Sequence, residues 1–234
     1  MENSLAHPLF IEFYGLPGCG KSTVSTRVAE WLRVDGYVVD EPSYLEDHKP
    51  AFKRKLWKLF VGCSWFLFRH VLYKSISSLV AENGYDGVER FTQSVNLIQK
   101  FGIYKRNNTG RIIIWDQGII QAAISLSIKG KLSASENLQR IKSYLSDDLL
   151  ILRVYLPTEL AVSLKRMECR RTNDSRVEKL DGEESKLNML RAFETGIDSI
   201  RGSYKGGEAE IIANASDRLD ANVEFVYHSI KQRL

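Results

Sequence analysis

The sequence predicts a three-layer α/β/α fold, in which a five-stranded parallel sheet is covered by helices on both faces. Short runs of apolar and β-branched residues alternate with segments of helical periodicity, the pattern of α/β proteins. The 234 residues are 44% hydrophobic and 26% charged, which suits one globular domain over residues 1–234 with its own core. In such a sheet we expect ligands at the carboxyl ends of the strands.

The elements before residue 110 follow from local patterns. An apolar run predicts the first strand, helical spacing predicts the next helix, and Pro42 blocks extension of a short second strand. A long helical region follows, with a break at Gly62, and a turn at 107–110 ends it. The expected ranges are strand 9–14, helix 22–34, strand 37–40, helix 51–82 and helix 86–106.

The second half repeats the alternation of strands and helices. Three consecutive isoleucines before Trp115 and Asp116 indicate a central buried strand. A second apolar run after residue 148 predicts another buried strand. The expected ranges are strand 111–116, helices 118–129 and 134–145, strand 149–156, helices 158–170 and 183–204, strand 210–213 and helix 220–233.

A phosphate-binding loop motif, G-x-x-x-x-G-K-[ST], spans the junction between the first strand and the first helix. Its glycines allow backbone N–H groups to surround an anion at the start of the helix. Lys21 is expected to reach the β and γ phosphates, and Ser22 to ligate Mg²⁺. This predicts a P-loop NTPase fold with ATP and Mg²⁺ as cofactors. The residues predicted to bind the nucleotide here are Gly15, Pro17, Gly18, Cys19, Gly20, Lys21, Ser22 and Thr23.

Two acidic positions end neighbouring strands. Asp116 follows the isoleucine run, where a carboxylate would organise Mg²⁺ beside the loop, although an N-cap for the next helix is the alternative. Glu41, next to Asp40, could accept a proton from a substrate hydroxyl, orient the substrate or hold a metal-bound water. The alternative for Glu41 is a solvated loop. Either Glu41 or Asp116 could be the base.

An arginine cluster lies between the fourth strand and a long helix. Arg166 and Arg170 share a helix face, and Arg171 and Arg176 follow in a polar connection. Guanidinium groups stabilise the charge that spreads over a transferred phosphoryl group. We therefore predict a lid over residues 166–183, in which Arg170 and Arg176 act catalytically and Arg166 and Arg170 bind the nucleotide. The alternative is a solvated charged helix face.

The chain resembles the nucleoside monophosphate kinase group of P-loop kinases, most of all thymidylate kinase and its deoxynucleoside kinase relatives. The resemblance is carried by the loop, the strand-end Glu41-Pro42, Asp116 and the arginine-bearing segment after residue 163. It implies an ATP-dependent kinase in which Lys21 and lid arginines stabilise the transferred group. An arginine such as Arg166 or Arg170 would stack on adenine.

The acceptor side departs from that family. The family has an arginine after the strand aspartate, whereas this chain has Gln117 and then Gly118. A neutral amide does not replace that charge. Residues 42–110 correspond to the helical acceptor-binding region, where Arg69, His70 and Arg90 could hold an acceptor anion or be surface residues.

Composition narrows the function classes. The net charge is +4 with basic and acidic residues interspersed, so no nucleic-acid surface is expected. Three scattered cysteines and no signal-peptide pattern favour a cytoplasmic protein. The aromatic and basic segment 52–73 suits the core or a homodimer interface better than a membrane surface or an apolar acceptor.

The leading hypothesis is an ATP-dependent phosphotransferase with a small-molecule phosphate acceptor. The acceptor could be a nucleotide, a nucleoside or a sugar-like molecule, and GTP could replace ATP as the donor. A kinase of a lipid-linked acceptor and a nucleotide-binding switch that transfers no phosphate are the alternatives. A GTPase switch is disfavoured because no Asn-Lys-x-Asp motif occurs.

Overall fold

The computed structural model gives the arrangement of most of the chain. It describes residues 7–42, 70–105, 110–145, 151–169, 177, 180, 182–203, 210–213 and 219–234.

A five-stranded sheet forms the centre of the molecule, with the order β2-β3-β1-β4-β5. Every neighbouring pair is parallel, so the predicted α/β class and parallel sheet are confirmed. Because β1 lies in the middle, its end is flanked on both sides by the ends of β3 and β4. The strands are β1 (Leu9–Tyr14), β2 (Val38–Asp40), β3 (Arg111–Trp115), β4 (Ile151–Tyr155) and β5 (Glu210–Ile212).

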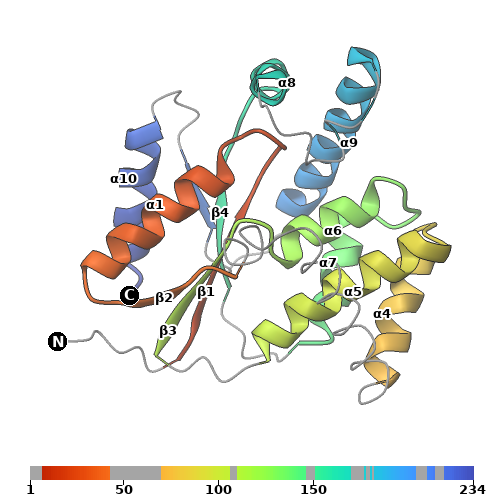
Figure 1. The fold of residues 1–234 in the computed structure, drawn as a ribbon, viewed down its shortest axis with the longest axis horizontal. Coiled ribbons are helices and arrows are strands. Elements are labelled where there is room, and N and C mark those ends of the chain that lie inside the picture. Colours follow the sequence, from red (N-terminus) through yellow and green to blue (C-terminus); the bar gives the residue numbers. More distant parts are fainter. Residues whose placement is uncertain are drawn as a thin grey trace.

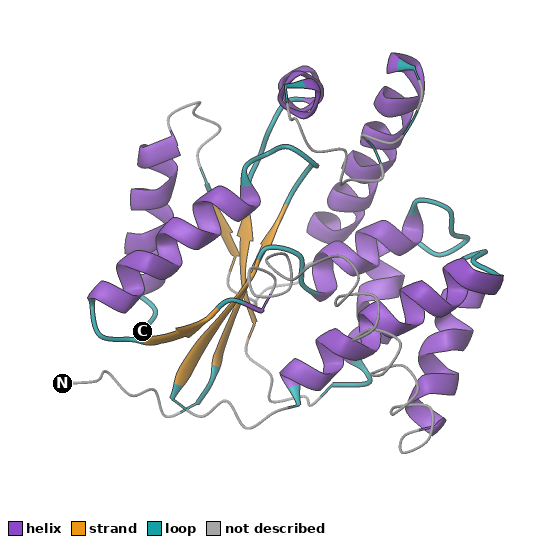
Figure 2. Cartoon of the chain, viewed as in Figure 1, coloured by secondary structure: helices purple, strands orange, loops and turns teal. Residues whose placement is uncertain are grey.

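Helices lie on both faces of the sheet, as Figures 1 and 2 show. Helices α1 and α10 pack side by side on one face, and α4 to α7 with α9 lie on the other (Figure 1). The described helices are α1 (Lys21–Val34), α4 (His70–Glu82), α5 (Gly87–Tyr104), α6 (Ile119–Ser127), α7 (Ala134–Lys142), α8 (Leu160–Glu168), α9 (Glu183–Gly202) and α10 (Leu219–Lys231).

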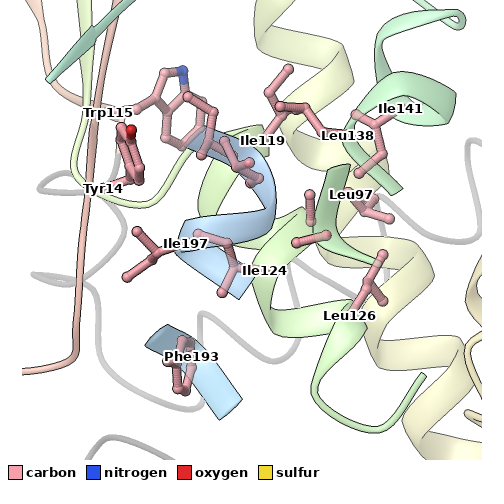
Figure 3. Packing of buried hydrophobic residues seen from close by; sticks show 14 of the residues in the cluster. Tyr14, Leu97, Trp115, Ile119, Ile124, Leu126, Leu138, Ile141, Phe193 and Ile197 are labelled. Carbon is pink, nitrogen blue, oxygen red and sulfur yellow. The ribbon is translucent and has the colours of Figure 1, made fainter. Parts of the chain in front are cut away.

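Two hydrophobic cores follow from the alternation of side chains along β1. Ile11 and Phe13 face α1 and α10, whereas Phe10 and Tyr14 face the larger core beneath α5, α6 and α9. Figure 3 shows part of that larger core, with Tyr14 and Trp115 entering from the sheet beside side chains from four helices. Glu12 has the same orientation as Phe10 and Tyr14, and it is the one acid in this buried strand.

The observed elements match the predicted ones closely, with differences of one to three residues at their ends. The predicted helix over 51–82 is confirmed over His70–Glu82, and its earlier part lies outside the described residues. Most of segment 52–73 lies outside them too, so its role stays a prediction. Within the described ranges, no helix is both long and apolar enough to cross a bilayer.

A buried pair of amides joins α4 to α7. The Asn83 side chain donates to Asn137 Oδ1 at 2.7 Å, and Asn137 donates back to Asn83 Oδ1 at 3.0 Å. Both side chains are fully buried, so removal of one leaves the Oδ1 atom of the other without its hydrogen bond, although each amide nitrogen keeps a backbone carbonyl as a second partner.

We expect Asn137→Ala to lower the free energy of unfolding by about 1–3 kcal/mol, because Asn83 loses its reciprocal hydrogen bonds. Urea denaturation followed by circular dichroism measures the change. In the double variant Asn83→Ala with Asn137→Ala, the loss should be smaller than the sum of the two single losses. Strict additivity would contradict the proposed coupling of the two amides.

Candidate active site

The phosphate-binding loop runs from the end of β1 to the start of α1, as the motif predicts. Gly18 and Gly20 adopt left-handed backbone angles, with φ of 84° and 95°. The loop is pinned from the side, because the Ser163 hydroxyl of α8 donates to the carbonyl of Pro17. Cys19 is buried beneath it.

The first turn of α1 is open to an anion. Gly20 is the N-cap and supplies no side-chain hydrogen bond, and the first turn holds no acidic residue. The N–H groups at a helix start carry partial positive charge and need an acceptor from outside the helix. A phosphate group is the kind of ligand that supplies such oxygens.

Lys21 folds back over the loop. Its ammonium donates to the carbonyl oxygens of Gly15 at 3.0 Å and Leu16 at 2.8 Å, and it lies 3.6 Å from Cys19 Sγ. The charge is thus held directly above the loop. The contact of Lys21 with the β and γ phosphates stays a prediction.

Ser22 and Asp116 come together although 94 positions separate them in the sequence. The Ser22 hydroxyl donates to Asp116 Oδ2 at 2.7 Å. Asp116 Oδ1 is buried and has no hydrogen-bond partner among the described residues. A hydroxyl beside a carboxylate with a spare oxygen is a donor set that suits Mg²⁺ and its water ligands. The two predicted metal residues therefore fit a magnesium site.

Glu41 engages a different partner. Its carboxylate accepts from Arg33 of α1 at 2.7 Å, and Arg33 also donates to the Val39 carbonyl at 3.0 Å. Glu41 is nearly buried, so it is not the solvated loop residue of the alternative interpretation. Asp40 instead pairs with Arg111 at 2.9 Å.

The comparisons with known proteins bear on the fold of the chain. No protein-family model matches the chain, and no curated protein matches it in sequence. Among solved structures, the deoxyadenosine kinase from M. mycoides with the products dCMP and dCDP has a TM-score of 0.55 and 17% identity. It covers 96% of this chain and 100% of that one. This chain has the fold of the P-loop kinases.

Two further solved structures show lower similarity. The same deoxyadenosine kinase with dATP bound gives a TM-score of 0.54 at 16% identity, over 95% of this chain and 99% of that chain. Shikimate kinase from Acinetobacter baumannii in complex with shikimate gives a TM-score of 0.49 at 13% identity, over 99% of this chain and 97% of that chain.

The predicted lid is only partly described. Arg166 lies in the last turn of α8, whereas Arg170 and Arg176 lie outside the described residues, and their roles stay predictions. Thr23 is exposed in the first turn of α1. Arg90 of α5 donates to the carbonyl and hydroxyl of Ser77 at 3.1 and 2.8 Å, a contact that ties α5 to α4.

Two residues that contact the segment after Asp116 were not predicted from the sequence. Lys100 of α5 donates to the backbone carbonyl of Gln117, and its ammonium lies 4.7 Å from the centre of the Trp115 ring. Glu12 of β1 accepts the backbone N–H groups of Ile119 and Ile120 at 3.1 and 2.9 Å. A lone acid in an apolar strand is the only sequence signal that could have indicated Glu12.

Burial and hydrogen bonding act in opposite directions on Glu12. Its burial raises the pKa of the carboxyl above 4.5, and the Tyr104 hydroxyl, the two N–H groups and Lys100 counteract that rise. Burial likewise raises the pKa of the Tyr104 hydroxyl, with the Glu12 charge as the second cause.

Gly18 makes a testable contribution to the loop. A Cβ at residue 18 would lie 2.9 Å from the Ser163 carbonyl oxygen, whereas a Cβ at Gly20, with a similar φ of 95°, would meet no atom of the described residues within 4 Å. We expect Gly20→Ala to cost about 1–2 kcal/mol for its left-handed backbone angle alone. Gly18→Ala should cost more, because the loop must also move away from α8. Urea denaturation of both variants measures the difference, and equal losses would contradict this account.

Proposed function

We propose that this chain is an ATP-dependent kinase that transfers a phosphoryl group to a small-molecule acceptor of nucleotide or nucleoside type. The observation that carries the proposal is the hydrogen bond from Ser22 to Asp116, placed beside a loop that holds Lys21 above it. This arrangement combines a phosphate cradle, a cation and a carboxylate within one edge of the sheet, which are the parts that phosphoryl transfer requires.

Each group then has a role. The loop N–H groups and the start of α1 hold the triphosphate, and Lys21 turns from the loop carbonyls to the β and γ phosphates. Mg²⁺, held through Ser22 and Asp116, would neutralise charge on the phosphate oxygens. Arginines of the lid, among them Arg166, Arg170 and Arg176, add charge as transfer proceeds.

Glu41 and Asp116 remain the two candidates for the base. Asp116 is occupied by Ser22 in a position that suits the metal, which favours Glu41 for the proton transfer. The Arg33 contact holds the Glu41 carboxylate in place at the end of β2. To act on a hydroxyl, Glu41 must exchange part of that contact for the acceptor.

The predicted acceptor region contributes a cation beside the neutral residue 117. Lys100 brings an ammonium group to the Gln117 carbonyl from the neighbouring helix α5. This cation supports an acceptor with an anionic group, as in a nucleotide. A neutral nucleoside acceptor would make less use of it.

Lys21→Met should reduce ATP-dependent phosphotransfer by on the order of a hundredfold or more, because the charge on the transferred group loses its preorganised partner. Lys129→Met is the matched control, since Lys129 forms a surface pair with Glu89 at 2.9 Å. The assay measures ADP release with and without pooled nucleosides, nucleotides and sugars. Full activity of the Lys21 variant would overturn the proposal. Tight ATP binding without acceptor-stimulated release would indicate the nucleotide-binding switch instead.

Two further variants distinguish the residue that binds the metal from the residue that acts as the base. Asp116→Asn should weaken the magnesium-dependent part of ATP binding by on the order of tenfold, because a neutral amide is a poorer partner for the cation and its waters. Glu41→Gln should leave Mg·ATP binding intact and lower turnover, because an amide accepts no proton. Calorimetric titration and the transfer assay measure the two effects. The opposite pattern would exchange the two roles.

A further inference from the structure

Glu12 stands in an unusual place for an acid. It lies within the central strand, and its side chain is fully buried between the sheet and the helices of the larger core. In the sheet register it lies opposite Trp115 of β3 and Arg153 of β4. A buried carboxylate is costly unless hydrogen bonds satisfy its oxygens, so its contacts carry information about its role.

Those contacts converge on the start of α6. Oε1 accepts the N–H of Ile119 at 3.1 Å and the Tyr104 hydroxyl, and Oε2 accepts the N–H of Ile120 at 2.9 Å. Ile119 and Ile120 are the first two residues of α6, whose N-cap Gly118 supplies no side-chain hydrogen bond. Glu12 therefore performs from the central strand the capping that a local Ser, Thr or Asp normally performs.

Gly118 fits Glu12 sterically. A Cβ at residue 118 would overlap three carboxyl atoms of Glu12, well inside the 3.0 Å that real Cβ atoms respect. The glycine thus permits the carboxylate to approach the helix start. This close fit links a residue of β1 to the segment that follows Asp116.

The segment 116–118 is held at both ends. Trp115 is fixed by its pairing with Glu12 in the sheet, and Ile119 is fixed by the Glu12 carboxylate. Between them, Lys100 donates to the Gln117 carbonyl, and Ser22 donates to Asp116. Because only residues 116–118 separate these two fixed positions, a shift of α6 would also move Asp116.

We propose that Glu12 is a positioning residue for the magnesium site, because its capping of α6 fixes the Asp116 carboxylate beside Ser22. This inference rests on the proposed function, in which Asp116 and Ser22 hold Mg²⁺. Its own contacts are with Tyr104 and the start of α6, so it would act without touching the metal or the nucleotide. It acts through the helix start and the short connection.

Glu12→Gln is the informative change because it keeps the size of the side chain. A glutamine has one acceptor oxygen, so its amide NH₂ would point at either the Ile119 or the Ile120 N–H group. That repulsion between donors loosens the start of α6 without creating a cavity. Glu210→Gln is the matched control, since Glu210 also accepts a tyrosine hydroxyl, that of Tyr14, but lies on β5.

The experiment measures the Kd of the non-hydrolysable analogue β,γ-imido-ATP with and without Mg²⁺, at a temperature well below the unfolding transition of each variant. The Kd without Mg²⁺ divided by the Kd with Mg²⁺ measures how much the metal strengthens binding. A general loss of stability affects both Kd values alike and leaves this ratio unchanged. We expect Glu12→Gln to reduce the ratio by on the order of tenfold and Glu210→Gln to preserve it.

The results of this experiment decide whether Glu12 positions the magnesium site. An unchanged ratio in a folded Glu12→Gln protein would overturn the role of Glu12 and leave the proposed kinase intact. If that variant does not fold, Glu12→Asp, whose shorter side chain withdraws the carboxylate from the Ile119 and Ile120 N–H groups, decides instead: a reduced ratio supports the role, and a wild-type ratio overturns it. A wild-type protein that gains no affinity from Mg²⁺ would overturn the magnesium site and, with it, this role.

Discussion

The parallel pairing of β1 with β3 is the constraint on which the rest of the site depends. The register places Glu12 opposite Trp115, so the two strands end at the same edge of the sheet. From that edge β1 leads into the phosphate-binding loop, and β3 leads into Asp116. The Ser22 to Asp116 hydrogen bond can form only because this register is kept. The apolar side chains of both strands, buried in two cores, hold the register in place.

Local features of the sequence were sufficient to predict most of the fold. A strand, a glycine loop and a helix are each encoded within a few residues, so the loop and Lys21 could be placed without knowledge of the tertiary structure. Asp116 could be placed because a run of isoleucines is compatible with few environments other than a buried parallel strand. The order of the strands, β2-β3-β1-β4-β5, was not among the predictions, because it depends on which strands pair in the folded sheet.

Contacts between distant residues could not be predicted in the same way. Glu12 and Tyr104 are 92 positions apart, and Glu12 and Ile119 are 107 apart. Only the folded sheet brings α5 and α6 to the same carboxylate. The same holds for Arg33, whose contact with Glu41 turns a strand-end acid toward α1. A sequence pattern indicates which residue types are present at an edge, whereas the three-dimensional packing determines which of them face one another.

The charge near residue 117 illustrates this difference. Compared residue by residue with the family that it resembles, the chain has a neutral Gln117 where an arginine is expected. In the folded protein, Lys100 places an ammonium at the Gln117 carbonyl and against the Trp115 ring. Its charge also counteracts the rise in the pKa of the buried Glu12 carboxyl. One cation on α5 thus serves both the short connection after Asp116 and the acid that caps α6. In the proposed kinase, an acceptor anion bound by Lys100 would lie beside the segment that connects Asp116 to α6.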